Sequence, residues 1–202
     1  MRPQPEDVLR FWFPEGLDRD EQTHRDAIAR WFRGGTTDEI RARFVPTLEA
    51  AIRGELDDWA RTPRGRLALI LVLDQFSRSV YDDARAYAQD AKAQQLAKEA
   101  FDAHENEGLP VWEQMFLSLP FGHSEDLALQ DRAVAISESL VPLAPPHLRA
   151  LYEKAVNQPK AHRDVIRRFG RHPHRNAALG RTSTPEELAY IAAGDFPHTR
   201  KT

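Results

Sequence analysis

The segment LALILVLDQF, residues 67 to 76, decides the fold of this chain. It lies within a longer stretch from Pro63 to Ser79. This stretch opens on Thr62-Pro63, a capping hydroxyl followed by a proline at the first helical position. Apolar residues occupy every face of a helix with this sequence, so we predict that the helix is buried on all sides. Such a helix needs other elements packed around it.

The rest of the chain is predicted to be helical as well, because helix signals recur along it and alternating strand patterns are absent. With 202 residues, the chain is long enough for one domain with a substantial core. We therefore predict a single all-α domain over residues 1 to 202, with its core from about residue 5 to about residue 193 and about nine helices. The predicted helices are Pro5 to Phe13, Asp20 to Arg33, Thr37 to Arg53, Pro63 to Ser79, Asp90 to Glu105, Pro110 to Leu119, Ser124 to Leu143, Pro146 to Gly170 and Pro185 to Ala193.

The composition is that of a folded globular protein, with 41% apolar and 29% charged residues. The absence of cysteine excludes disulfides, zinc-thiolate sites and thiol nucleophiles. The N-terminus lacks the apolar segment of a secretory signal, and the longest apolar run, Leu67 to Leu73, is too short to span a bilayer. A net charge of −3 argues against a general nucleic-acid binder. We expect a cytoplasmic protein with neither nucleic acid nor membrane as a partner.

Residues 160 to 181 reverse the sign of the charge, with seven Lys or Arg residues and one acid. Unpaired like charges repel, so this basic segment is either a site for an anion or one half of an internal ion-pair network. Gly170 is expected to end the preceding helix, which leaves Arg171 and Arg175 on a loop. From there, their guanidinium groups can reach a carboxylate or a phosphate in bidentate fashion.

Asp74 and Gln75 are polar residues at positions where the pattern of the central helix calls for burial. A buried carboxylate needs a positive partner or several donors, or its pKa rises until it becomes neutral. Arg78 lies one helical turn later and can supply the pair. The alternatives are a structural ion pair that ties this helix to a neighbour and a functional site.

His162 is expected on the apolar face of the helix predicted from Pro146 to Gly170. A histidine there is either a core residue hydrogen bonded to a carboxylate or carbonyl, or a functional group. Pro159 lies on the same face and predicts a kink or an interruption one turn before it. We expect that irregularity to leave carbonyl groups free near His162.

His123 follows a predicted helix break at Leu119-Pro120. Ser124 is expected to cap the next helix, and Glu125 and Asp126 then fall in its first turn, where the helix dipole favours acids. Capping accounts for these three residues but not for His123.

Named catalytic signatures are absent, including G-x-G-x-x-G, the P-loop, G-x-S-x-G and H-E-x-x-H. We predict no cofactor. Side chains of types that suit a divalent ion are present, but nothing in their spacing fixes a metal site, so we predict none. They are Asp74, His123, Glu125 and His162.

Three blocks of sequence carry a family resemblance: LDQFSRSVY at 73 to 81, LSLPFGHSEDLALQDRAV at 117 to 134, and HRDVIRRFGRHPHRNAALGRTSTPEE at 162 to 187. The opening DVLRFWF and the pair Trp31-Phe32 fit the same pattern. From about Pro5 to about Ile191, the chain resembles the bacterial family known as domain of unknown function 924. The resemblance implies an all-helical fold with tetratricopeptide-like packing, and it implies no agreed biochemical activity.

Two positions depart from the family's pattern. At His172 an aromatic such as phenylalanine is expected, so the surroundings are more polar here. At Ser77 a proline is expected, and without it the helix can continue toward Tyr81. The motif positions fall on Asp74, Gln75, Phe76, Arg78, His123, Ser124, Glu125, His162, Phe169, Gly170, Arg171, Pro173, Arg175, Asn176, Gly180 and Arg181.

We expect three segments to converge: the helix 63 to 79, the turn 119 to 125 and the loop 170 to 176. Each places polar groups where its own pattern calls for burial, and such groups must find partners. The candidate ligand-binding residues are Asp74, Gln75, Arg78, His123, Glu125, His162, Arg171, Arg175 and Asn176.

Three classes of function are compatible with these residues. The first is a binding module for a small anionic ligand or a peptide carboxylate, with arginines as clamps. The second is a hydrolase or another general acid/base enzyme in which His162 or His123 acts with a carboxylate. The third is a helical interaction scaffold whose polar cluster is structural only. We favour binding, because no nucleophile with an adjacent base can be read from the spacing.

Overall fold

The helix predicted from Pro63 to Ser79 forms the centre of the fold and continues to Val80. In the computed structural model, which describes residues 4 to 194, it comprises α5 (Pro63–Ile70), a π-helical segment η2 (Leu71–Phe76) and α6 (Ser77–Val80). The hydroxyl of Thr62 caps it by accepting a hydrogen bond from the amide of Gly65 at 3.1 Å. The apolar side chains from residue 67 to 73 are all buried, which confirms the prediction of a helix enclosed on every side.

The π-helical segment is the local feature that sequence patterns did not predict. Its backbone stays right-handed at both junctions, so α5, η2 and α6 form one continuous rod with a wider turn in the middle. Asp74 and Gln75 lie in this turn, and both side chains are buried. Single π turns inside α-helices occur frequently at functional sites.

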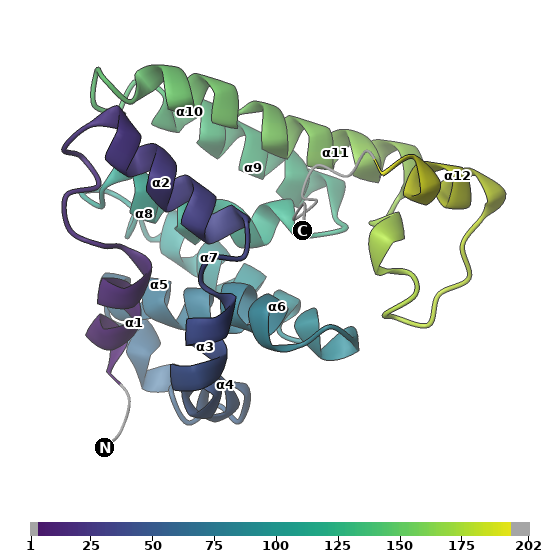
Figure 1. The fold of residues 1–202 in the computed structure, drawn as a ribbon, viewed down its shortest axis with the longest axis horizontal. Coiled ribbons are helices and arrows are strands. Elements are labelled where there is room, and N and C mark those ends of the chain that lie inside the picture. Colours follow the sequence, from purple (N-terminus) through teal and green to yellow (C-terminus); the bar gives the residue numbers. More distant parts are fainter. Residues whose placement is uncertain (1–3, 195–202) are drawn as a thin grey trace.

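Helices pack around this rod from several sides (Figure 1). They are α1 (Pro5–Trp12), α3 (Thr37–Arg43), α4 (Val45–Ile52), α7 (Asp90–Asp102) and α8 (Val111–Gly122). Aromatic rings fill the space between them, and the ring of Phe76 lies 5.7 Å from that of Trp12 and 5.2 Å from that of Phe44, measured between centroids. Each fully buried ring or large aliphatic side chain contributes roughly 1.5 to 3 kcal/mol, so this core holds the rod in place.

The remaining helices form a second layer. α9 (Leu127–Leu140) contacts both α8 and α11 (Asn157–Phe169), and α9, α10 (Arg149–Ala155) and α11 lie along the top of Figure 1. α2 (Glu21–Phe32) lies in front of them in that view. At the far end, α12 (Pro185–Ala193) packs against the short 3-10 turn η4 (Pro173–Arg175). Two further 3-10 turns are η1 (Asp57–Arg61) and η3 (Ala84–Ala86).

Two predicted helices are each divided. The helix predicted from Thr37 to Arg53 breaks at Phe44, because Pro46 lacks the amide hydrogen that a continuous helix needs there. The helix predicted from Pro146 to Gly170 breaks at Val156, one turn before Pro159, as expected.

The helix break predicted at Leu119-Pro120 was wrong. α8 runs through Pro120 to Gly122, and the hydrogen bond from the amide of His123 to the carbonyl of Leu119 is kept at 3.2 Å. The cap of α9 was also misplaced. Asp126, not Ser124, lies at the cap and accepts a hydrogen bond from the amide of Ala128 at 2.7 Å.

Over residues 4 to 194 the regular structure is entirely helical, which confirms the all-α, single-domain prediction. The predicted domain limits at residues 1 and 202 lie outside this range, and tetratricopeptide-like packing stays a prediction. No helix within 4 to 194 has both the length and the apolar character required to cross a membrane.

Candidate functional site

The basic segment from residue 160 to 181 is neutralised from within the protein. Each of its seven cations lies against an acid supplied mainly by α7, α9 or α12, and the closest N to O distances range from 2.6 to 3.3 Å. The internal ion-pair alternative therefore accounts for the reversal of charge. The pairs are Lys160 with Glu138, Arg163 with Asp131, Arg167 with Asp131, Arg168 with Glu186, Arg171 with Glu187, Arg175 with Asp90 and Arg181 with Glu125.

Arg171 does not join the predicted polar cluster. Its Nε and Nη2 atoms donate to the two carboxylate oxygens of Glu187 at 2.6 and 2.8 Å, and Nη2 also donates to the carbonyl of Thr182. Glu187 belongs to α12, where the hydroxyl of Thr184 accepts from the amide of Glu187 and completes a capping box. Arg171 thus fastens α12 to the body of the protein.

Glu125 and Asn176 brace the loop rather than the cluster. Glu125 accepts from both terminal nitrogens of Arg181, at 2.8 and 3.1 Å, and from the amide of His172 at 2.8 Å. Asn176 accepts from Nε of Arg181 at 2.9 Å and donates to the hydroxyl of Ser183. These bonds fix the path of residues 172 to 183, and η4 lies within that path.

A chain of alternating charges connects the central rod to η4. Nη1 of Arg78 donates to Oδ1 of Asp74 at 3.0 Å, and Nη2 of Arg78 donates to both carboxylate oxygens of Asp90 at 2.8 and 2.9 Å. Nη1 of Arg175 then donates to Oδ2 of Asp90 at 3.0 Å. Two of the three predicted segments thus meet through Asp90, a residue that sequence reasoning missed. Asp90 begins α7, where an acid already has a local explanation in the helix dipole.

His123 adds the third segment, because its Nδ1 atom lies 2.7 Å from Oδ1 of Asp74. Nε2 of Gln75 donates to the other oxygen of the same carboxylate at 2.5 Å. Burial opposes ionisation of Asp74, but the charge of Arg78 and the hydrogen bonds from His123 and Gln75 outweigh it and hold the pKa of Asp74 well below its usual value. Asp74 is therefore a buried, ionised carboxylate shared among three partners.

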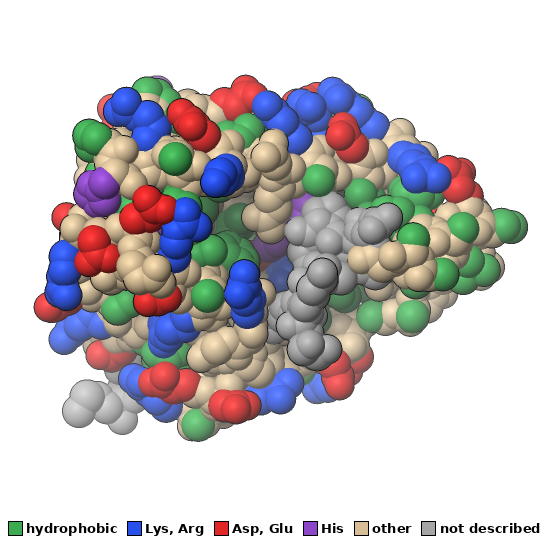
Figure 2. Space-filling view, turned by 45° about the horizontal axis from the view of Figure 1, so that its top comes forward, with side chains coloured by type: hydrophobic (Ala, Val, Ile, Leu, Met, Phe, Trp, Pro, Cys, Tyr) green, Lys and Arg blue, Asp and Glu red, His purple; other side chains and the backbone are tan. Residues whose placement is uncertain are grey.

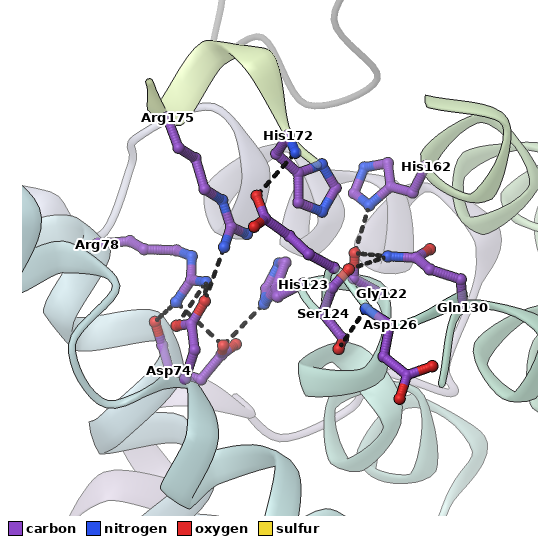
Figure 3. Close-up of polar contacts among 12 residues, drawn as sticks. Asp74, Arg78, Gly122, His123, Ser124, Asp126, Gln130, His162, His172 and Arg175 are labelled. Carbon is purple, nitrogen blue, oxygen red and sulfur yellow. Dashed lines mark hydrogen bonds and ion pairs between the residues drawn. The ribbon is translucent and has the colours of Figure 1, made fainter. Parts of the chain in front are cut away.

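The ring of His123 is neutral at pH 7, because burial and then the nearby charge of Arg78 lower its pKa. A neutral ring beside an ionised carboxylate carries its hydrogen on Nδ1 and donates it to Asp74. The lone pair is then on Nε2, which has no hydrogen-bond partner among residues 4 to 194. In Figure 3, His123 lies between Asp74 on one side and His162 and His172 on the other.

His162 is a buried core histidine, as one of the two alternatives predicted. Its Nδ1 atom lies 3.0 Å from the carbonyl oxygen of Gly122. That carbonyl comes from the end of α8 and not from the break before Pro159. Burial lowers the pKa of His162 to about 4, and the ring is neutral at pH 7.

His172 packs as an aromatic residue would, although it is a histidine. It is completely buried, and its ring centroid lies 6.0 Å from that of His162 and 5.4 Å from that of His174. Burial, followed by the charge of Arg175, lowers the pKa of His172. Burial also lowers the pKa of His174 to about 3. The histidines around η4 therefore add no positive charge at pH 7.

Several of these groups line a cavity of about 510 Å³. Figure 2 shows the molecule hollowed in the middle of one face, with histidine and basic side chains visible at depth beside hydrophobic ones. The polar end is lined by Gln75, Arg78, His123, His162, His174 and Arg175. The apolar wall includes Trp31, Phe32, Met115, Leu119, Leu140 and Pro159.

Arg175 has hydrogen-bonding capacity that the protein does not use. Among residues 4 to 194, only Asp90 accepts from it, through Nη1, and its buried Nε atom has no partner. Its guanidinium group also lies over the ring of Tyr87, 4.7 Å from the centroid. Burial lowers the pKa of Arg175, which means that the site holds this cation at a cost. The charges of the two arginines and the two aspartates at this end of the cavity balance.

Side chains of the types that suit a divalent ion already have partners within the protein. Asp74 is occupied by His123 and Arg78, and Glu125 is occupied by Arg181. Within the part of the chain that the structure describes, no group of three or more His, Asp or Glu side chains is placed to hold a metal ion.

Comparisons with known proteins agree with this fold. No functionally curated protein matches the chain. Among solved structures, the protein of unknown function ATU0120 from Agrobacterium tumefaciens is 35% identical in sequence, with a TM-score of 0.75. The likeness covers 94% of this chain and 97% of that one. The family model for bacterial proteins of unknown function DUF924 matches residues 8 to 195, in agreement with the resemblance in the sequence. The chain therefore belongs to the DUF924 family.

Proposed function

We propose that this protein binds a small amphipathic carboxylate in the cavity between α2, α8, α9, α11 and η4. The carboxylate group contacts Arg175 at the polar end, and the apolar part of the ligand lies along the opposite wall. Among the small anionic ligands expected from the sequence, the proposed ligand carries a single negative charge.

The unused donors of Arg175 carry the proposal. Nη2 of Arg175 makes no hydrogen bond among residues 4 to 194, so an oxygen acceptor in the cavity can receive its N–H groups and lower the cost of burying the guanidinium group. A hydrogen bond to a charged partner contributes about 1.5 to 3 kcal/mol, which is enough to fix the orientation of a small ligand. Because Asp74 and Asp90 already balance Arg78 and Arg175, this end of the cavity has no excess positive charge, and a single carboxylate fits it better than a doubly charged phosphate.

The apolar wall explains why the ligand needs a hydrocarbon part. Trp31 and Phe32 come from α2, and Met115 and Leu119 come from α8, so two helices supply apolar side chains to the cavity. A cavity of about 510 Å³ is in the usual range for small-molecule sites. Burial of each additional methylene contributes about 0.8 kcal/mol, or roughly a fourfold gain in affinity.

Isothermal titration with hexanoate, octanoate and decanoate tests this function, with decan-1-ol as the uncharged comparison. We expect binding to tighten roughly fourfold per methylene and the alcohol to bind at least about tenfold more weakly than decanoate. Arg175→Gln should weaken octanoate binding by about tenfold or more. The matched control is Arg168→Gln, which removes an exposed arginine paired with Glu186 outside the cavity.

Ala155→Trp provides a second variant that leaves the ion pairs of Arg175 intact. Ala155 lines the cavity and is only half-buried, so an indole there fills space without overpacking the core. This variant should abolish binding of all three carboxylates. Equal affinity for decanoate and decan-1-ol, or unchanged octanoate binding in Arg175→Gln, would exclude the proposed site. In that case the polar cluster is structural only.

A further inference from the structure

We infer that the same cavity hydrolyses carboxylic esters with an apolar acyl chain, with His123 as the general base toward water and Arg175 as the donor to the carbonyl oxygen. This inference rests on the proposed function, because the acid released by such a reaction is the ligand proposed above. Asp74 is a positioning residue that holds the ring of His123.

The pairing of His123 with Asp74 sets it apart from His162. A carboxylate at Nδ1 fixes the tautomer of His123 and stabilises the imidazolium that forms when Nε2 accepts a proton. Nδ1 of His162 lies instead against the carbonyl oxygen of Gly122, which offers no countercharge. His123 lines the cavity, and its side chain is 16% exposed whereas that of Asp74 is 1% exposed. Nε2 has no hydrogen-bond partner among residues 4 to 194 and is not one of the buried polar atoms, so it belongs to the exposed part of the ring.

Water is the nucleophile in this reaction. Ser118 is a hydroxyl of α8 that lines the cavity, but it donates to the carbonyl of Met115 at 2.8 Å within its own helix. Among residues 4 to 194, His123 has no hydroxyl partner of the kind that a covalent mechanism requires. A water molecule between Nε2 of His123 and the ester carbonyl supplies the attacking oxygen.

The reaction consumes one water molecule and needs no other co-reactant. As the water oxygen bonds to the acyl carbon, one of its protons passes to Nε2 of His123, and the carbonyl oxygen becomes an oxyanion that accepts N–H bonds from Arg175. When this tetrahedral species collapses, the bond to the alcohol oxygen breaks, and the imidazolium returns its proton to that oxygen. One ester and one water thus give one carboxylic acid and one alcohol, with His123 and Arg175 unchanged.

The probe is p-nitrophenyl octanoate, and the readouts are release of p-nitrophenolate and octanoate affinity measured on the same proteins. His123→Asn keeps an N–H near the position of Nδ1 and removes Nε2. It should lower kcat by about 100-fold or more while changing octanoate affinity by less than about threefold. The matched control is His104→Asn, which replaces an exposed histidine outside the cavity and should leave kcat unchanged.

If His123→Asn does not fold, the pH dependence of ester hydrolysis by the wild-type protein tests the role of His123. Hydrolysis should fall with a single protonation as pH decreases, because protonated His123 cannot accept a proton. The titratable and charged groups that face His123 from its neighbours are Asp74, Arg78, Asp90, His162, His172, His174 and Arg175.

Three results would overturn the inference. They are an octanoyl adduct in the intact mass of the quenched protein, a kcat that His123→Asn does not lower, and octanoate binding without ester hydrolysis. The last result leaves the proposed binding function standing. Failure of octanoate to bind the wild-type protein removes both proposals.

Discussion

Asp74 and His123 are joined by a contact of 2.7 Å between Oδ1 and Nδ1, although 49 residues separate them in the chain. This contact links the π-helical turn of the central rod to the end of α8. It also places an ionised carboxylate and a neutral imidazole at the polar end of the cavity. The stability of the rod and the chemistry of the cavity therefore depend on the same bond.

Asp74→Asn should be strongly destabilising. The substitution leaves Arg78 buried with Asp90 as its remaining carboxylate, and loss of one partner from a buried ion pair costs about 3 to 5 kcal/mol. Urea unfolding measures this free energy. The control is Asp131→Asn, because Asp131 is exposed and pairs with Arg163 and Arg167 on the surface, where such pairs contribute up to about 1 kcal/mol. Equal losses in the two variants would contradict this interpretation of the buried pair.

His162 should make the protein less stable as pH falls from about 6.5 to about 4. The unfolded chain binds a proton at the higher value and the folded protein only at the lower one, so acid favours unfolding in this window. The difference between these two pKa values corresponds to a loss of about 3 kcal/mol in the free energy of unfolding. His162→Asn keeps a donor to the carbonyl of Gly122 and should lose less stability between pH 7 and pH 4 than the wild type. An identical pH dependence would show that His162 titrates normally.

Arg171→Gln should loosen α12 without unfolding the protein. Arg171 supplies the bidentate contact to buried Glu187, whereas Arg168 reaches α12 only through an exposed pair with Glu186. Hydrogen exchange of the amides from 187 to 193 should quicken by about tenfold in Arg171→Gln and change little in Arg168→Gln. Similar exchange rates in the two variants would contradict the conclusion that Arg171 holds α12 against the rest of the protein.

Ser77→Ala should be neutral or stabilising. Ser77 is completely buried at the start of α6, and its hydroxyl has no hydrogen-bond partner among residues 4 to 194. Removal of such a group relieves a desolvation cost of about 1 to 3 kcal/mol, offset in part by lost packing. Ser79→Ala is the comparison, because its hydroxyl donates to the carbonyl of Gln75. A higher melting temperature for Ser79→Ala than for Ser77→Ala would contradict this expectation.

Local features of the fold could be predicted from the sequence because their causes lie within a few residues. The capping role of Thr62, the end of α11 at Gly170 and the break before Pro159 all depend on adjacent backbone chemistry. The burial of residues 67 to 73 follows from their composition alone. The π turn at Leu71–Phe76 has no comparable signal in the local sequence.

The membership of the polar cluster was predicted in part. Asp74, Arg78, His123 and Arg175 meet as expected, since each is a polar group in a buried segment. The identities of the ion-pair partners could not be predicted, because carboxylates are chemically equivalent and only the tertiary fold selects among them. Arg175 pairs with Asp90, and nothing in the sequence around either residue distinguishes this acid from the others.

A crystal structure of the protein grown with decanoate tests the central claim most directly. We predict a carboxylate oxygen within hydrogen-bonding distance of a guanidinium nitrogen of Arg175, and an alkyl chain against Trp31 and Leu119. Decanoate ordered elsewhere on the protein, or an empty cavity at a decanoate concentration that saturates the titration, would contradict the claim.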